Sequence, residues 1–205
     1  MKSNVLVMLV SILAGCATGR SATPPNIYDF GPPGWPIKEA VEATHGARIA
    51  LDVWAAPWLD STYIDYRLAY DDPLKRRQYA DSRWASSPRT LVAQQLQRQL
   101  GLVSINGGVS VDCLMRVELH EYSHVFGSVQ ESRGVLLGQA SLIDGKRRVI
   151  AVRPFNVEVA ATTPDAPGGV RALVQSSVEM GQQLGVWLNQ LEKNGRIGAC
   201  SLGKG

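Results

Sequence analysis

The sequence predicts a single α+β domain in which a mixed, mostly antiparallel sheet carries two helices on one face. Several segments alternate apolar and polar residues, as strands do, and two segments have apolar residues at helical spacing. The order is strand, short strands, helix, three-strand meander and helix, which is typical of helices packed on one sheet. Hydrophobic residues make up 45% of the 205 residues, so the chain can bury one core of ordinary size.

The first half of this domain is expected to begin with strands. A short strand is expected to start near Tyr28-Asp29-Phe30, and residues 47–54 alternate as a longer strand. Two further short strands are expected at 63–67 and 77–80, on either side of the turn-forming Asp71-Asp72-Pro73. Turn chemistry also explains the other acidic residues of this stretch, Asp60 and Asp65.

A helix is expected to follow Ser87-Pro88, because Ser favours the N-cap and Pro fits the first turn. Apolar residues then recur at helical spacing, at Leu91, Val92, Leu96 and Leu100. Gly101 can end this helix, because glycine readily adopts the left-handed conformation of a C-terminal cap.

The second half of the domain is expected to be a meander followed by a long helix. We expect strands at 109–126, 134–143 and 149–160, with a tight hairpin at Asp144-Gly145. Residues 162–168 break the pattern before the helix. Its buried face is expected to hold Val170, Leu173, Val174, Ser177, Gly181, Leu184, Leu188 and Leu191. Gly181 and Gly185 form a G-x-x-x-G pattern, which we interpret as close packing on the sheet.

The N-terminus has the form of a lipoprotein signal peptide. Lys2 precedes a short apolar stretch, 5–14, which is too short to span a membrane. The stretch ends in Leu13-Ala14-Gly15-Cys16, which resembles a bacterial lipobox, where small residues precede a thiol that receives a diacylglyceryl group. The alternative is an ordinary signal peptide followed by an unrelated cysteine. That alternative explains the position of Cys16 and its spacing from the apolar stretch less well. We predict acylation of Cys16, and this covalent lipid is the only cofactor expected.

We divide the chain where its composition changes. Residues 1–15 are the signal peptide, 16–27 the lipidated cysteine and its tether, 28–195 the folded domain, and 196–205 a C-terminal tail. Position 17 is Ala, whereas Asp there is associated with retention at the inner membrane. This favours lipid anchoring at the outer membrane, with the domain facing the periplasm.

One motif matches zinc hydrolases. His120-Glu121-Tyr122-Ser123-His124 has the H-E-x-x-H pattern, which needs a helix so that both imidazoles reach one metal. The surrounding alternation predicts a strand instead, with the two imidazoles about 13 Å apart and Glu121 on the opposite face. We therefore interpret both histidines as solvent-facing, and predict no metal site and no enzyme; zinc hydrolysis remains the minor alternative.

The strand would divide its residues between two faces: Cys113, Met115, Val117 and Leu119 on one, and Arg116, Glu118, His120, Tyr122 and His124 on the other.

Charge and cysteine content limit the remaining function classes. The chain has 21 Lys+Arg and 18 Asp+Glu, so its charge of +3 gives no argument for a nucleic-acid partner. The basic triplets at 75–77 and 146–148 are interpreted as solvated turn residues, with attraction to anionic headgroups as the alternative. Two thiols remain besides Cys16. An oxidising periplasm would allow Cys113 and Cys200 to form a disulfide, and the sequence leaves that pairing open.

Three short motifs, which follow one another along the chain, indicate the function more specifically. These are Pro57-Trp58-Leu59-Asp60, then Tyr63-Ile64-Asp65-Tyr66-Arg67, then Arg83-Trp84-Ala85 before Ser87-Pro88 and a helix. They resemble the motifs of the ABC-type transport auxiliary lipoproteins, the PqiC-like family. The sequence departs from that pattern at Trp58, where Tyr is usual, at Ser61, where Arg is common, and at 86–87, where an acidic residue and Pro are typical.

The resemblance implies a non-catalytic accessory protein of a lipid transport system. Its partners would be an MCE-domain substrate-binding protein and the ABC transporter complex, and its cargo a phospholipid or another hydrophobic compound. A homo-oligomer is left open. The candidate partner-binding residues are Trp58, Leu59, Asp60, Arg83 and Trp84. For the tryptophans, Trp54 included, packing in the core is the competing interpretation. The alternative function is a lipoprotein binding module of another envelope assembly system.

Overall fold

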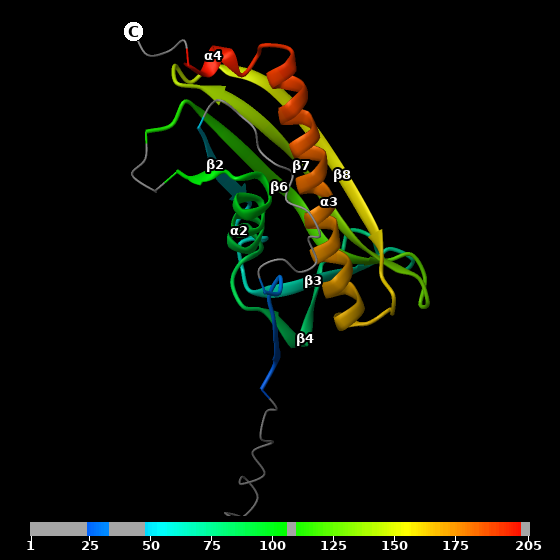
Figure 1. The fold of residues 1–205 in the computed structure, drawn as a ribbon. Coiled ribbons are helices and arrows are strands. Elements are labelled where there is room, and N and C mark those ends of the chain that lie inside the picture. Colours follow the sequence, from blue (N-terminus) through cyan, green and yellow to red (C-terminus); the bar gives the residue numbers. More distant parts are fainter. Residues whose placement is uncertain (1–23, 33–47, 106–109, 202–205) are drawn as a thin grey trace, which may run out of the picture.

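A curled, eight-stranded mixed sheet with two long helices on one face forms the domain, as the sequence predicts (Figure 1). The computed structural model describes residues 24–32, 48–105 and 110–201. The predicted signal peptide, Cys16 and most of the predicted tether lie outside these ranges. The α+β fold class predicted from the apolar patterns is therefore confirmed for the described chain.

The strands and helices follow the expected order, with the addition of β5 and α4, which the sequence did not predict. The strands are β1 (Asn26–Tyr28), β2 (Ile49–Ala55), β3 (Tyr63–Leu68), β4 (Arg77–Trp84), β5 (Val103–Ser104), β6 (Cys113–Phe126), β7 (Ser132–Asp144) and β8 (Val149–Ala160). The helices are α2 (Pro88–Leu100), α3 (Ala166–Lys193) and the short α4 (Gly198–Ser201). The expected signals bound α2, since Pro88 occupies its first turn and Gly101 is left-handed with φ 64°.

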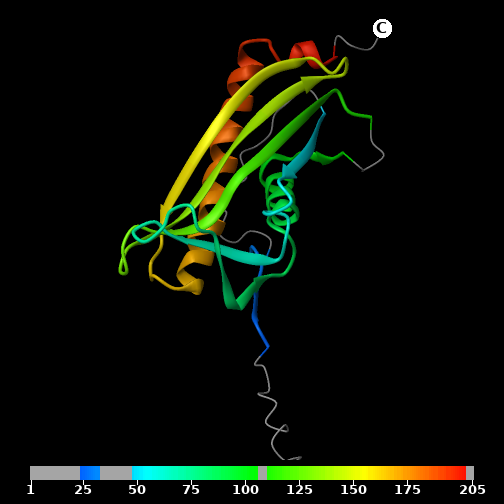
Figure 2. The same ribbon diagram turned by 180° about the vertical axis from the view of Figure 1, so that it is seen from behind.

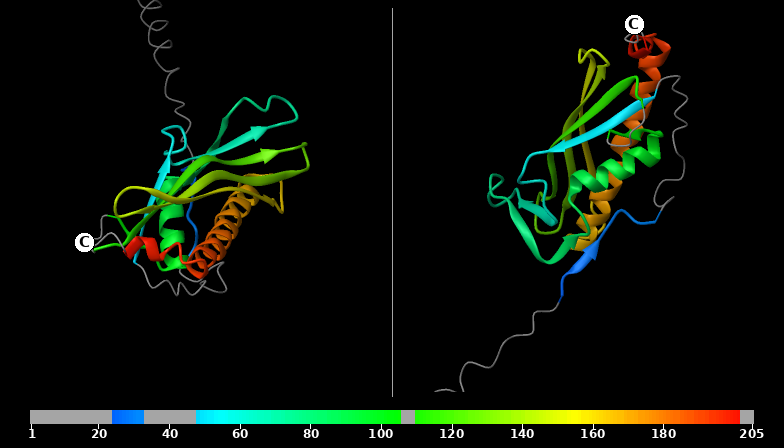
Figure 3. Two further views of the ribbon diagram at one scale, coloured as in Figure 1. Left: turned by 90° about the horizontal axis from the view of Figure 1, so that it is seen from above. Right: turned by 90° about the vertical axis from the view of Figure 1, so that its left-hand side faces the viewer.

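The long strand β6 organises the sheet. One edge pairs antiparallel with β7, which pairs antiparallel with β8. The other edge pairs in parallel with β2 along its first half and with β3 at its last three residues. Seen from above, α2 and α3 lie together on the concave side of the curled sheet (Figure 3). In the view from behind, no described helix covers the outer face of β6, β7 and β8 (Figure 2).

A β-bulge at His120 corrects the predicted faces of β6. Leu119 pairs with Gly138 and Glu121 with Leu137, so His120 is an extra residue in the ladder. An inserted residue turns every later side chain to the opposite face. Tyr122 and His124 therefore point into the core, where the uninterrupted alternation had placed them in solvent. The predicted faces were right from Cys113 to His120 and wrong for Tyr122 and His124.

Glycines allow α3 to pack closely on the sheet and on α2. A Cβ on Gly134 of β7 would overlap the backbone of α3 at Ala172 and Leu173, so α3 can lie directly on β7 only because no side chain is there. A Cβ on Gly181 of α3 would instead overlap the Gln99 side chain of α2. The predicted close packing at Gly181 is thus helix against helix, and not helix against sheet. All eight predicted core positions of α3 are buried.

The C-terminal end of the domain is fixed by a disulfide. Cys113 at the start of β6 is bonded to Cys200 in α4, with their Cα atoms 5.2 Å apart. Both cysteines and Ile197 are almost completely buried. The region after α3 is therefore part of the folded domain as far as α4, although the sequence assigned residues 196–205 to a tail.

Candidate docking surfaces and an apolar groove

The turn after β2 presents one predicted residue to solvent and buries its neighbour. The backbone amide of Leu59 donates to the Ala56 carbonyl at 2.8 Å, which closes the turn. Trp58 is 62% exposed, whereas Leu59 is 2% exposed and belongs to the core. Asp60 lies 3.4 Å from the Arg89 guanidinium and so ties the turn to the first turns of α2. Of these three candidates, Trp58 alone has a side chain available to a large partner.

The other two candidate partner-binding residues, Arg83 and Trp84, make contacts within the domain. The Arg83 guanidinium lies 4.2 Å from the centre of the Tyr63 ring and donates to the Tyr79 carbonyl and, at 2.8 Å, to the Ser82 carbonyl. Trp84 is 2% exposed and packs edge-on against Phe30, with ring centroids 5.8 Å apart. Trp84 therefore packs in the core, which was the interpretation competing with partner binding.

A second exposed tryptophan lies on the outer face of the sheet. Trp54 is 48% exposed and lines a shallow hollow of about 320 Å³ with Asp52, Arg116 and Glu118. Arg116 donates to Asp52 at 3.1 Å, and the Gln139 amide donates to Glu118 at 2.9 Å. An aromatic face beside satisfied charges is suited to protein contact, because Trp buries a large area at little cost in ordering.

The H-E-x-x-H residues do not form a zinc site. His120 is exposed on the bulge, whereas the His124 side chain is fully buried. The Nδ1 atom of His124 forms a 2.8 Å hydrogen bond with the Tyr79 hydroxyl. Burial lowers the pKa of the His124 imidazole to about 4. The interpretation as solvent-facing is right for His120 and wrong for His124. Within the described ranges, no three His, Cys, Asp or Glu side chains gather as metal ligands.

Glu121 belongs to a partly buried group of charges instead. Its Oε2 atom accepts from Arg67 at 2.9 Å and from Arg76 at 3.0 Å, and Arg76 also donates to Asp65 at 2.8 Å. Burial raises the pKa of the Asp65 carboxyl, and the Arg76 guanidinium opposes that shift. These four residues connect β3, β6 and the segment before β4. Asp65 is thus a buried ion-pair partner and not a turn residue, and Arg76 is not a freely solvated cation.

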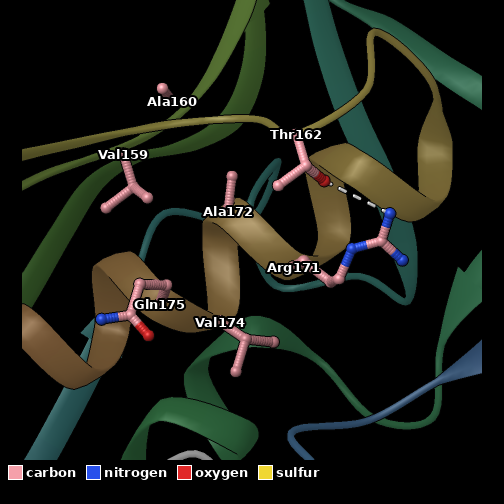
Figure 4. Close-up of a pocket in the computed structure, with 7 residues that line it drawn as sticks. All are labelled: Val159, Ala160, Thr162, Arg171, Ala172, Val174 and Gln175. Carbon is pink, nitrogen blue, oxygen red and sulfur yellow. Dashed lines mark hydrogen bonds between the residues drawn. The ribbon is translucent and has the colours of Figure 1, made fainter.

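Two hollows flank the first half of α3, and together we name them the α3 groove. The first, of about 250 Å³, is lined by Val159, Ala160, Thr162, Ala172 and Gln175 (Figure 4). The second, of about 360 Å³, is lined by Ile27, Tyr28, Asp29, Gly31, Pro167 and Val170. Arg171 and Val174 line both hollows and lie between them. The groove therefore joins β1, the end of β8 and α3.

Sequence reasoning did not find the α3 groove. Of its helix residues, the sequence assigned only Val170 and Val174 to the core, and both are buried. The walls that complete it come from segments about 130 residues apart in the chain, β1 and the end of β8. No local pattern connects such segments, so only the tertiary structure could place them together.

Comparisons with solved structures agree with this fold. A Xanthomonas campestris protein of the family DUF330 superposes with a TM-score of 0.64 at 17% identity, covering 84% of this chain and 98% of that one. The structure of an uncharacterized protein gives 0.62 at 14% identity, with 81% and 99% covered. A Caulobacter crescentus chain matches with a TM-score of only 0.37 at 17% identity, over 49% of this chain and 83% of that one.

Comparisons of the sequence identified no related protein. No protein-family model matches the chain, and no curated protein matches it. Within the described residues, no helix is long and apolar enough to cross a membrane. At 14% and 17% identity, the two close superpositions establish a shared fold: an α+β domain of the kind found in the DUF330 protein.

Proposed function

We propose that this protein is an outer-membrane lipoprotein that serves as a non-catalytic docking component of an ABC-type lipid transport system with an MCE-domain subunit. The observation that carries the proposal is the combination of a lipobox at Cys16 with a domain that shares the fold of a DUF330 protein along almost that protein's whole length. DUF330 is the family of the PqiC-like lipoproteins, whose motifs the sequence resembles.

The chemistry of the domain supports a docking role. The motif that suggested hydrolysis is divided between an exposed bulge residue and a buried imidazole, and its glutamate is held by two arginines. Among the described residues, the exposed tryptophans Trp54 and Trp58 instead offer large aromatic surfaces to a protein partner. We assign partner binding to Trp58 first, because it lies in one of the motifs shared with the auxiliary lipoproteins.

The anchor is tested by mass spectrometry of the protein from native membranes. Acylation predicts that the mature N-terminal peptide begins at Cys16 and carries a diacylglyceryl group, and that the protein fractionates with the outer membrane. A Cys16→Ser variant should lose the modification and leave that fraction. An unmodified Cys16 thiol on native protein would refute this part of the proposal.

The partner is tested by affinity purification of the acylated full chain from native membranes. An MCE-domain protein and its ABC transporter subunits should copurify. Trp58→Ala should lower their recovery by about tenfold or more, as expected for an interface tryptophan. Tyr70→Ala removes another exposed aromatic side chain, in the loop after β3, and should leave recovery unchanged. Intact acylated protein that retains none of these subunits would refute the docking role.

A further inference from the structure

Among the described residues that line it, the α3 groove combines apolar walls with one cation, Arg171. We propose that it binds an anionic phospholipid, with the phosphate held by Arg171 and the first part of the acyl chains lying in the two hollows. This inference rests on the proposed function, which would bring lipid to the domain, and it names the molecule that the domain itself holds. The groove differs from the exposed tryptophans assigned to protein contact, because it is concave.

The walls of the groove suit hydrocarbon. Val159, Ala160 and Ala172 line one hollow, and Ile27, Tyr28 and Val170 line the other. Ile27 is 61% exposed in the ladder that pairs β1 with β4, so its apolar side chain is available to a ligand. Small-ligand sites are typically concave and mainly apolar, with a few polar groups that fix the orientation of the ligand. The two hollows, of about 250 and 360 Å³, have this character.

Arg171 supplies the polar group. Its Nη2 atom makes a long hydrogen bond, at 3.4 Å, to the Thr162 hydroxyl (Figure 4). A second long bond, at 3.5 Å, reaches the Thr163 hydroxyl. Among the described residues it forms no salt bridge. An exposed, loosely held guanidinium between two apolar hollows complements an anionic headgroup that carries hydrocarbon chains.

The two carboxylates near the groove are already engaged. Asp165 accepts from the Gly168 amide at 2.8 Å and from the Thr163 hydroxyl at 2.7 Å. The bonds from Thr163 and Gly168, and to a smaller extent the charge of Arg171 itself, lower the pKa of its carboxyl, although Asp165 and Arg171 form no salt bridge. Asp29 accepts from the Gly31 amide at 2.8 Å. Each carboxylate thus stabilises a local turn or helix start, and Arg171 remains the group that can meet a phosphate.

The position of the groove also favours a lipid. Ile27 and Tyr28 in β1 lie shortly after the predicted lipid attachment at Cys16. A fully extended chain from Cys16 to Ile27 spans at most about 40 Å. The groove of an anchored protein therefore stays within about one bilayer thickness of the membrane surface, where phospholipids are the most abundant apolar ligands.

Photo-crosslinking tests the proposal on the acylated full chain in vesicles. The probe is phosphatidylglycerol with a diazirine near the start of one acyl chain, and mass spectrometry maps the labelled peptides. Labels should concentrate on residues 24–31 and 159–175. Arg171→Glu should reduce this labelling by about fivefold or more, the effect of one basic side chain at an anionic lipid surface. Ala160→Trp, which fills one hollow from an exposed position, should reduce it similarly.

Matched variants control for altered charge and folding. Arg98→Glu makes the same charge change on an exposed position of α2, and Val186→Trp adds the same ring to an exposed position of α3. Both should keep wild-type labelling, and all four variants should keep the wild-type urea midpoint. Phosphatidylcholine with the same diazirine should label the groove more weakly, since its headgroup has no net charge.

Three results would overturn the inference. The first is labelling that Arg171→Glu and Ala160→Trp leave unchanged. The second is labelling spread evenly over the surface. The third is displacement by millimolar glycerol phosphate alone, which would identify a site for free anions. Copurification with the transporter needs no lipid in this groove, so its success beside failed labelling would reject the lipid site and leave the docking role standing.

Discussion

The Cys113–Cys200 disulfide should contribute more to stability than any other single bond in this domain. It joins residues separated by 87 positions, from the start of β6 to α4, and so closes nearly half of the chain into a loop. In the chain-entropy model, a loop of that length restricts the unfolded state by about 4–5 kcal/mol at 25 °C. Reduction should therefore lower the free energy of unfolding by up to that amount.

The assay is urea unfolding of the full chain in mild detergent, oxidised and reduced, followed by the fluorescence of the buried Trp84 and Trp187. With a slope of about 2–3 kcal/mol per molar urea, reduction should shift the midpoint down by about 2 M. A Cys113→Ala/Cys200→Ala variant should unfold near the reduced midpoint and should not respond to reductant.

The reduced protein should also lose order first at its C-terminal end. Ile197 and Cys200 are buried while Arg196 is exposed, so the bond holds a short segment against β6 that has few other contacts. Trypsin should then cleave after Arg196 well before the rest of the domain. Coincident urea midpoints for oxidised and reduced protein would refute the reasoning, because the loop constraint acts whatever the native packing.

Three further perturbations test the packing and the buried charges. Gly134→Ala forces a Cβ into the backbone of α3 and should cost about 1–3 kcal/mol of stability. Glu121→Gln leaves Arg67 and Arg76 without their shared carboxylate and should cost about 1–2 kcal/mol, since both arginines are partly solvated. His124 has its pKa lowered from 6.5 to about 4, so the unfolded chain binds its proton more readily. Its neutral form should therefore contribute stability above pH 6.5 that is lost, by up to about 3 kcal/mol, as the pH falls towards 4.

Each of these has a matched control in urea unfolding. Gly145→Ala adds a Cβ with only an ordinary contact at 3.9 Å and should be nearly neutral. Glu158→Gln breaks the exposed pair with Arg133, which lies at 2.7 Å, and should cost no more than about 1 kcal/mol. His124→Gln should flatten the difference in stability between pH 6.5 and 4 relative to the wild type. Equal losses in a test variant and its control, or an unchanged pH dependence, would contradict the structure.

The predictable parts of the fold are those with signals close together in the sequence. Pro88 and Gly101 bounded α2 because such end signals depend on the residues at the ends of the helix itself; Ser87 occupies the N-cap position, but its side chain makes no capping hydrogen bond. The Asp144-Gly145 turn and the alternation on either side gave β7 and β8. The apolar spacing of α3 gave its buried face, because that spacing follows from the helix period alone.

The parts that escaped prediction depend on pairings between distant segments. Nothing around His120 indicates a bulge, yet that one residue decides that His124 is buried. Arg67 reaches Glu121, and Arg76 bridges Glu121 and Asp65, because β3 runs parallel to the end of β6, a pairing that leaves no trace in either segment. Gly181 has the spacing of a packing motif, but its partner, α2, is set by the curl of the sheet.

The separation of the exposed tryptophans from the α3 groove constrains how the protein can bind a partner and a lipid. The proposed recognition surfaces are the exposed Trp58 and Trp54 for a protein partner and the α3 groove for a lipid. These surfaces share no residues and come from different strands, so substitutions in them should act additively. Trp58→Ala should then reduce copurification without changing lipid labelling, and Arg171→Glu should do the reverse. If either substitution altered both readouts, lipid and partner would have to share one surface, and the assignment of two separate sites would fail.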